Sequence, residues 1–231
     1  MHIPDAVHAL DRDLRAIFGD RLRSLVVYAG MAGDDRTPTL AVVDGLSADD
    51  LRACVGRVAA WDDAGLSTPL FVAAHEFERS LDAFPFEFGA ILADHAVASG
   101  ADPFTGLRVD PSHLRQACEV QARSHLLHLR EGFLETRGRT DALAELLLRS
   151  APPLAALLQN VVRLEDSQAA SADAAAAVVE RKVGVPSGSL AHIARLVGRK
   201  DLSSDDARRL FPAYLDAVQR LAAYVDKWRA A

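Results

Sequence analysis

Three polar residues suited to chemistry share one helical stripe in this sequence. Gln121, His125 and His128 are spaced by four and three residues in a segment with helical periodicity, which puts them on one side of the expected helix. A histidine in this position could serve as a base or a ligand. Two histidines three residues apart can share a metal ion, but no acidic or cysteine ligand is fixed nearby. We therefore favour a hydrogen-bonded polar seam between two halves of the chain.

A second group of polar residues lies in the N-terminal half. Gly30 and Gly33 follow a short apolar segment, and Asp34 and Asp35 come directly after them. The Gly-x-x-Gly spacing is too short for a dinucleotide fingerprint. Two adjacent aspartates on an extended chain point in opposite directions, which disfavours a shared metal ion. Glu87 lies in an apolar run in which Phe86 and Phe88 flank it.

The first hundred residues must position the second group of polar residues. They alternate short apolar runs with residues typical of turns. Ser47, followed by acidic residues, is typical of a helix N-terminus. The alternation around Glu87 favours a strand there. The periodicity predicts helices at 6–18 and 47–64, a helical turn at 76–81, and strands at 24–29, 40–43, 70–73 and 84–92.

After Gly106 the pattern becomes helical. Asp110-Pro111 is typical of a helix start, and Ser203 with Asp206 resembles a capping box. Pro152-Pro153 removes two donors and is expected to break a helix. We expect Pro212 either to bend the last helix or to delay its start. The expected helices are 110–136, 141–149, 154–164, 173–182, 190–197 and 205–230.

Composition excludes several function classes. The chain has 231 residues, of which 25% are charged, and a formal net charge of -6, so binding to a nucleic-acid backbone is disfavoured. No apolar run is long enough to span a membrane, and the first residues lack the pattern of a signal peptide. The two cysteines, Cys54 and Cys118, are too few for a disulfide framework, which favours a reducing cytoplasm.

The order of these elements resembles the minimal nucleotidyltransferases, small polymerase-β-like domains often followed by a helical bundle. The resemblance rests on 25–33 (Leu-Val-Val-Tyr-Ala-Gly-Met-Ala-Gly) and 40–43 (Leu-Ala-Val-Val), with support from 84–88, 100–104 and the helix at 114–134. It implies an α+β fold, with a nucleotidyltransferase-like domain of mixed sheet at 1–106 and an all-α bundle at 107–231. It also implies nucleotide binding near Gly30 and Gly33.

The same resemblance defines the expected active site. Such enzymes place two aspartates one residue apart before the second strand, and a third carboxylate on a neighbouring strand, to hold two Mg²⁺ ions. Thr37-Pro38-Thr39 stands at the place of the aspartates here, and Gly30-Met31 at the place of a Gly-Ser turn. Glu87 matches the third carboxylate, and Asp34 and Asp35 are candidate replacement ligands.

These residues predict a catalytically degenerate nucleotidyltransferase-like protein that binds a nucleotide or a protein partner in a regulatory role. One alternative is an active, Mg²⁺-dependent nucleotidyltransferase that uses Asp34 or Asp35 with Glu87. Another is an interaction protein, either a homo-oligomer or one half of a toxin–antitoxin-like pair. Apolar residues of the last helix, from Phe211 to Trp228, would supply its contact face, although such a face is more often internal core.

Overall fold

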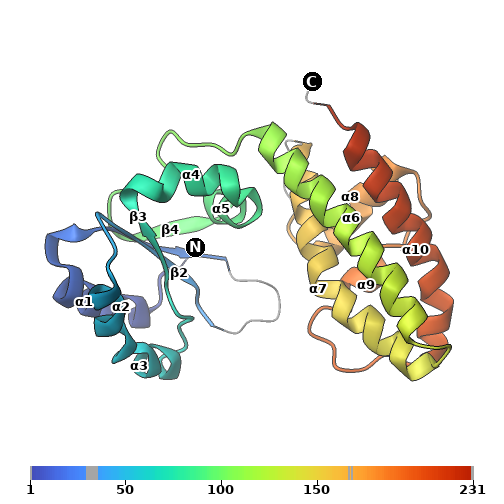
Figure 1. The fold of residues 1–231 in the computed structure, drawn as a ribbon, viewed down its shortest axis with the longest axis horizontal. Coiled ribbons are helices and arrows are strands. Elements are labelled where there is room, and N and C mark those ends of the chain that lie inside the picture. Colours follow the sequence, from blue (N-terminus) through green and yellow to red (C-terminus); the bar gives the residue numbers. More distant parts are fainter. Residues whose placement is uncertain (1, 30–35, 166, 168, 230–231) are drawn as a thin grey trace. The chain divides into compact units, whose positions relative to one another are not determined.

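The chain divides into two compact units, Met1–Asp110 (unit 1) and Pro111–Ala231 (unit 2) (Figure 1). The computed structural model describes residues 2–29, 36–165, 167 and 169–229. The division falls between Asp110 and Pro111, four residues after the boundary that the sequence suggests at Gly106.

Unit 1 is built on a four-stranded mixed sheet in the order β3-β2-β1-β4. β1 (Leu22–Tyr28) is antiparallel to both of its neighbours, β2 (Thr39–Val43) and β4 (His95–Gly100). β3 (Leu70–Ala73) runs parallel to β2. The strands expected at 24–29, 40–43 and 70–73 are thus confirmed.

Helices cover both faces of this sheet because the side chains of β1 alternate between two apolar cores. Leu25 and Val27 pack with α1 (Asp5–Phe18), α2 (Ala48–Val55) and α3 (Val58–Asp63). Val26 packs on the other face with α4 (Phe77–Ala83) and α5 (Pro85–Ala93). Short 3₁₀ turns, η1 (Gly19–Arg21) and η2 (Ala74–Glu76), precede β1 and α4.

The helix expected at 47–64 begins as predicted but is interrupted. Ser47 accepts a hydrogen bond from the Asp50 backbone N–H, and the Asp50 side chain accepts one from the Ser47 N–H, which forms a capping box. Arg21 holds the same carboxylate through two hydrogen bonds of 2.6 and 3.0 Å. Gly56 and Arg57 then separate α2 from α3.

The strand predicted at 84–92 is wrong, because this segment forms α5. Pro85 stands in its first turn, where a missing N–H costs nothing, and Phe88 and Ile91, one turn apart, both enter the core. A short apolar run cannot distinguish a buried strand from a buried helix, which is the source of the error. The fourth strand is instead β4, whose small residues carry a weak pattern.

β4 ends in a close backbone approach to β1. Gly100 has a φ of +79°, and a Cβ built there would lie 2.0 Å from the carbonyl oxygen of Arg23. Since both the left-handed conformation and the contact exclude a side chain, this position requires glycine.

Unit 2 is a five-helix bundle within the described residues. It comprises α6 (Pro111–Glu135), α7 (Thr140–Leu164), α8 (Ala172–Val183), α9 (Ala191–Ala194) and α10 (Ser204–Lys227) (Figure 1). α7 is central and packs against the other four helices. Its side chains therefore form much of the bundle core.

The two helices predicted on either side of Pro152-Pro153 are in fact the single helix α7. Leu147 and Leu154, which precede and follow the prolines, are both fully buried. Packing of both halves into one core thus offsets the hydrogen bonds that the prolines remove. Pro212 likewise lies inside α10, which begins at Ser204 without delay.

A buried carboxylate organises the turn before α9. Glu180 is 3% exposed and accepts hydrogen bonds from the backbone N–H groups of Gly188, Leu190 and Ala191 at 3.0, 2.7 and 2.9 Å. A carboxylate can compensate several unpaired backbone donors at once. Glu180 therefore has a structural role that its sequence context does not reveal.

The apolar face of the last helix is internal. Its large residues, Phe211, Tyr214, Val218, Leu221 and Val225, are buried in the bundle. The interface predicted on this helix is thus core, as most such faces are. None of the helices in the described part of the chain combines the length and apolar character that a bilayer-spanning segment requires.

Candidate functional site

The sheet edge where β1 ends and β2 begins carries the positions matched to the nucleotidyltransferase site. Val27 pairs with Thr39 across these strands, and Tyr28 pairs with His95 of β4. The backbone of Thr37 is bonded on both sides, since its N–H donates to Gly65 O at 2.9 Å and its carbonyl accepts from Ser67 N at 3.0 Å. The segment that leads into β2 is therefore fixed by main-chain contacts.

Thr37 and Thr39 occupy the positions where the resemblance implies aspartates. Thr37 is half-buried, whereas Thr39 is 1% exposed, and the Thr39 hydroxyl has no hydrogen-bond partner among the described residues. By strand alternation Thr39 shares the face of Ala41 and Val43, which pack with α1. Both side chains are neutral, so neither supplies a charge to this edge.

Glu87 does not lie on a strand of this sheet. It stands in the first turn of α5, and its side chain is exposed. The expectation that a neighbouring strand carries it is therefore corrected, and a catalytic role for Glu87 stays a prediction. Gly30, Gly33, Asp34 and Asp35 lie outside the described residues, so their expected roles in binding a nucleotide or a metal also stay predictions.

The described residues do not fit a pair of divalent cations. Magnesium prefers several oxygen ligands in octahedral geometry, with carboxylates prominent among them. Within residues 2–29, 36–165, 167 and 169–229, no group of three or more histidine, cysteine, aspartate and glutamate side chains is placed to hold a metal ion. The neutral hydroxyls of Thr37 and Thr39 cannot replace a set of carboxylate ligands.

One polar pair near this edge was missed by sequence reasoning. His95 Nε2 lies 3.3 Å from Asp102 Oδ1, while Nδ1 lies 3.0 Å from the carbonyl oxygen of Ile91. Asp102 also accepts a hydrogen bond from Phe104 N at 2.9 Å, and the His95 ring packs against Phe104. This pair fixes the turn after β4, and the Asp-Pro turn was its one signal in the sequence.

The helical stripe of Gln121, His125 and His128 does not converge on one point. Gln121 and His128 are exposed, and His128 Nδ1 lies 3.3 Å from Glu131. His125 instead turns into the bundle, where its Nε2 lies 2.5 Å from the hydroxyl of Tyr214. A functional role for the three residues stays a prediction, since their side chains enter different surroundings.

His125 belongs to a buried chain of polar groups that links α6, α10 and α7. Tyr214 donates its proton to Ser150 Oγ at 3.3 Å, so neutral His125 donates from Nε2 to the Tyr214 oxygen. Burial lowers the pKa of His125 to about 4, with a further contribution from nearby His128. Burial also raises the pKa of the Tyr214 phenol. This buried seam lies inside unit 2 and includes only His125 of the three residues, so the polar seam predicted between the two halves of the chain stays a prediction.

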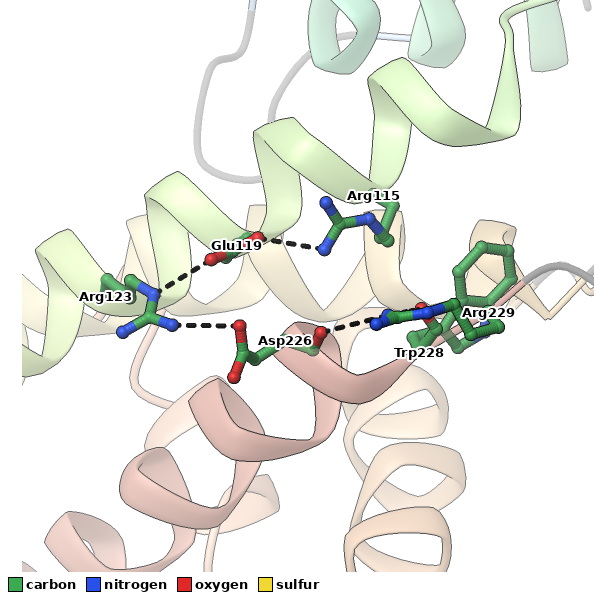
Figure 2. A network of polar contacts seen from close by, with 6 residues as sticks. All are labelled: Arg115, Glu119, Arg123, Asp226, Trp228 and Arg229. Carbon is green, nitrogen blue, oxygen red and sulfur yellow. Dashed lines mark hydrogen bonds and ion pairs between the residues drawn. The ribbon is translucent and has the colours of Figure 1, made fainter.

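A surface network joins the first half of α6 to the end of α10 (Figure 2). Glu119 accepts from Arg115 at 2.9 Å and from Arg123 at 3.1 Å, and Arg123 also reaches Asp226 at 3.0 Å. Both carboxylates raise the pKa of Arg123 through these hydrogen bonds. All three arginine–carboxylate contacts are internal to unit 2, so the network ties two helices together.

Comparisons with known proteins bear on the fold. No protein-family model matches the chain, and neither does any curated protein. Among solved structures, the spectinomycin adenyltransferase AAD(9) from Enterococcus faecialis, determined with ATP and spectinomycin, matches with a TM-score of 0.60. The match has 11% sequence identity and covers 96% of this chain and 99% of that chain. The chain therefore has an α+β nucleotidyltransferase-like fold followed by a helical bundle.

Proposed function

We propose that this protein is a catalytically degenerate member of the nucleotidyltransferase fold that acts as a nucleotide- or partner-binding regulatory module. The observation that carries the proposal is Thr37-Pro38-Thr39 at the start of β2. Two-metal transfer needs anionic oxygens that hold Mg²⁺ against the attacking and leaving groups. A threonine hydroxyl carries no charge, and that of Thr39 is buried.

A nucleoside triphosphate is the first ligand class to test, because the matched adenyltransferase was solved with ATP. A ligand that binds the native state raises the unfolding midpoint. We expect ATP, GTP, CTP or UTP to raise the midpoint equally with and without Mg²⁺, since the proposed site holds no metal of its own. A rise that requires Mg²⁺ would contradict this expectation and favour an active enzyme.

Catalysis itself is tested with labelled nucleotides. The protein is incubated with each labelled triphosphate, Mg²⁺ or Mn²⁺, and acceptors that include spectinomycin and the protein itself. We expect no transfer of the nucleotide. Metal-dependent transfer that is abolished by Glu87→Gln but retained by Glu76→Gln, an exposed glutamate of η2, would overturn the proposal. Loss in Asp34→Asn/Asp35→Asn would then identify the altered ligand set.

A second candidate function, homodimerisation, is favoured by an exposed apolar stripe on α6. Val120, Leu127 and Leu134 repeat every seven residues and are 60%, 62% and 76% exposed. A seven-residue repeat keeps these three side chains on one side of the helix, as one of the two apolar positions of a heptad does. Arg130 and Glu131 flank the stripe on opposite sides, so a second copy whose α6 runs parallel brings opposite charges together on each side. The proposed occupant is therefore a second copy of this chain.

Light scattering after size exclusion tests this candidate. We expect a dimer for the unaltered chain and a monomer for Leu127→Glu, because a buried carboxylate at the centre of the stripe is strongly unfavourable. Gln219→Glu, an exposed change on α10 and away from the stripe, is the matched control and should remain dimeric. A monomeric unaltered chain would contradict the candidate.

A further inference from the structure

Unit 1 contains a hollow that lies away from the sheet edge of the nucleotidyltransferase resemblance. It encloses about 660 Å³ on the face of the sheet that α4 covers. Its walls come from the start of β1, the end of β2, the turn after β3, α4 and the 101–107 segment. β1 begins where β2 and β3 end, so this hollow and residues 37–39 lie at opposite ends of the strands. The volume is within the range of small-molecule sites.

The base of the hollow holds a buried hydroxyl without a partner. Ser24 is 2% exposed and lines the hollow, and its Oγ has no hydrogen-bond partner in the part of the chain that the structure describes. Val42 and Phe77 beside it supply apolar surface. An unsatisfied buried hydroxyl is costly, and a valine or alanine would fill the same strand position without that cost. A ligand atom that bonds Ser24 Oγ accounts for this choice of residue.

The rim of the hollow offers one unneutralised guanidinium. Arg79 lines the hollow from α4 and has no ion pair with any residue in the described ranges. Arg23 also lines it but is paired with Asp44 at 2.5 Å. Glu78 adds a negative charge at the rim, which penalises a doubly charged phosphate more than a singly charged carboxylate. The planar guanidinium of Arg79 matches a carboxylate well.

We propose that this hollow binds a small organic carboxylate. Its anionic end meets Arg79, a polar atom bonds Ser24 Oγ, and its apolar body covers Val42 and Phe77. The proposal is independent of nucleotide binding at the opposite end of the strands, and it assigns unit 1 a second, effector-type ligand.

The test uses four ring compounds that differ mainly in charge. Benzoate, benzyl alcohol, benzylamine and phenyl phosphate are titrated into the full-length protein, and amide shifts are followed by NMR. We expect benzoate to bind most tightly, with shifts at 23–24, 75–79 and 101–107. Equal affinity for all four compounds, tighter binding of phenyl phosphate, or no shift in these segments would overturn the assignment of a carboxylate site.

Three variants locate the contacts. We expect Arg79→Gln to weaken benzoate by about tenfold, equivalent to about 1.4 kcal/mol, and to leave benzyl alcohol unchanged. We expect Ser24→Ala, which removes a hydroxyl without a partner and so preserves the fold, to weaken benzyl alcohol, whose hydroxyl bonds Ser24 Oγ, and to leave benzoate, whose only polar group meets Arg79, nearly unchanged. Arg52→Gln, an exposed arginine of α2, is the matched control and should change neither. Benzoate affinity that is unchanged in Arg79→Gln would contradict the proposal.

Discussion

The two units differ in whether their buried polar groups have hydrogen-bond partners. In unit 2, buried polar side chains have defined partners, as in the Glu180 carboxylate on three backbone N–H groups and the chain of His125, Tyr214 and Ser150. Within the described residues, the buried hydroxyls without a hydrogen-bond partner, those of Ser24, Thr39 and Ser67, all belong to unit 1, whereas the one such atom of unit 2, Asp173 Oδ1, lies 2.7 Å from the Arg195 guanidinium. Unit 2 thus uses its polar interior for stability, whereas unit 1 keeps groups that its own fold does not use.

The largest expected effect on stability comes from removing the buried Glu180 carboxylate of unit 2. Glu180→Ala leaves three buried N–H groups unpaired, so we expect the free energy of unfolding to fall by about 4 kcal/mol. Urea unfolding measures it. Glu145→Ala, an exposed change on α7, is the control and should cost less than about 0.5 kcal/mol. A small effect at Glu180 would show that water replaces the carboxylate.

A backbone contact provides the matching test in unit 1. Gly100→Ala places a Cβ against the Arg23 carbonyl and forces a left-handed conformation on alanine, so we expect a loss of about 3 kcal/mol. Gly45→Ala is the control, because a Cβ there meets nothing within 4 Å. Similar thermal unfolding midpoints for both variants would contradict the close approach of β4 to β1.

The buried seam of unit 2 predicts a pH dependence of stability. The pKa of His125 is about 4 in the folded protein, below its ordinary value of about 6.5, so the unfolded chain binds this proton first as the pH falls. The seam therefore stabilises the fold fully above pH ~6.5 and loses up to about 3 kcal/mol as the pH falls toward 4.

Unfolding free energies measured between pH 7 and 4.5 check this window. His125→Phe should flatten the slope, whereas the exposed change His128→Gln should leave it nearly intact. If the pH dependence of the unfolding free energy is unchanged in His125→Phe, then titratable groups other than His125 cause it.

The smallest expected effects compare the two kinds of hydroxyl directly. Thr39→Val removes a hydroxyl that has no partner and should change stability by less than about 0.5 kcal/mol or increase it. Tyr214→Phe removes a hydroxyl bonded to His125 and Ser150 and should cost about 1.5 kcal/mol. Chemical denaturation of both variants measures the difference, and equal losses would remove the contrast between the units.

Strong local signals predicted most of the fold. The capping box at Ser47, the β-branched strands and the Asp110-Pro111 start each reflect chemistry within a few residues, and the structure follows them. The failures at 84–92 and at Pro152-Pro153 arose where tertiary packing outweighed the local pattern. The sequence predicted less about the functional residues. The roles of Glu180, Ser24 and the pair of His95 and Asp102 depend on contacts with residues that come close only after folding.

Binding of Mn²⁺ in the presence of a non-transferable ATP analogue tests the absence of two-metal chemistry most directly, because it needs no acceptor. Electron paramagnetic resonance counts the ions held per chain. We predict that the unaltered protein holds no ion beyond the one that the analogue carries, and that Thr37→Asp/Thr39→Asp gains a site. A second ion held by the unaltered chain and lost in Asp34→Asn/Asp35→Asn would contradict the proposal.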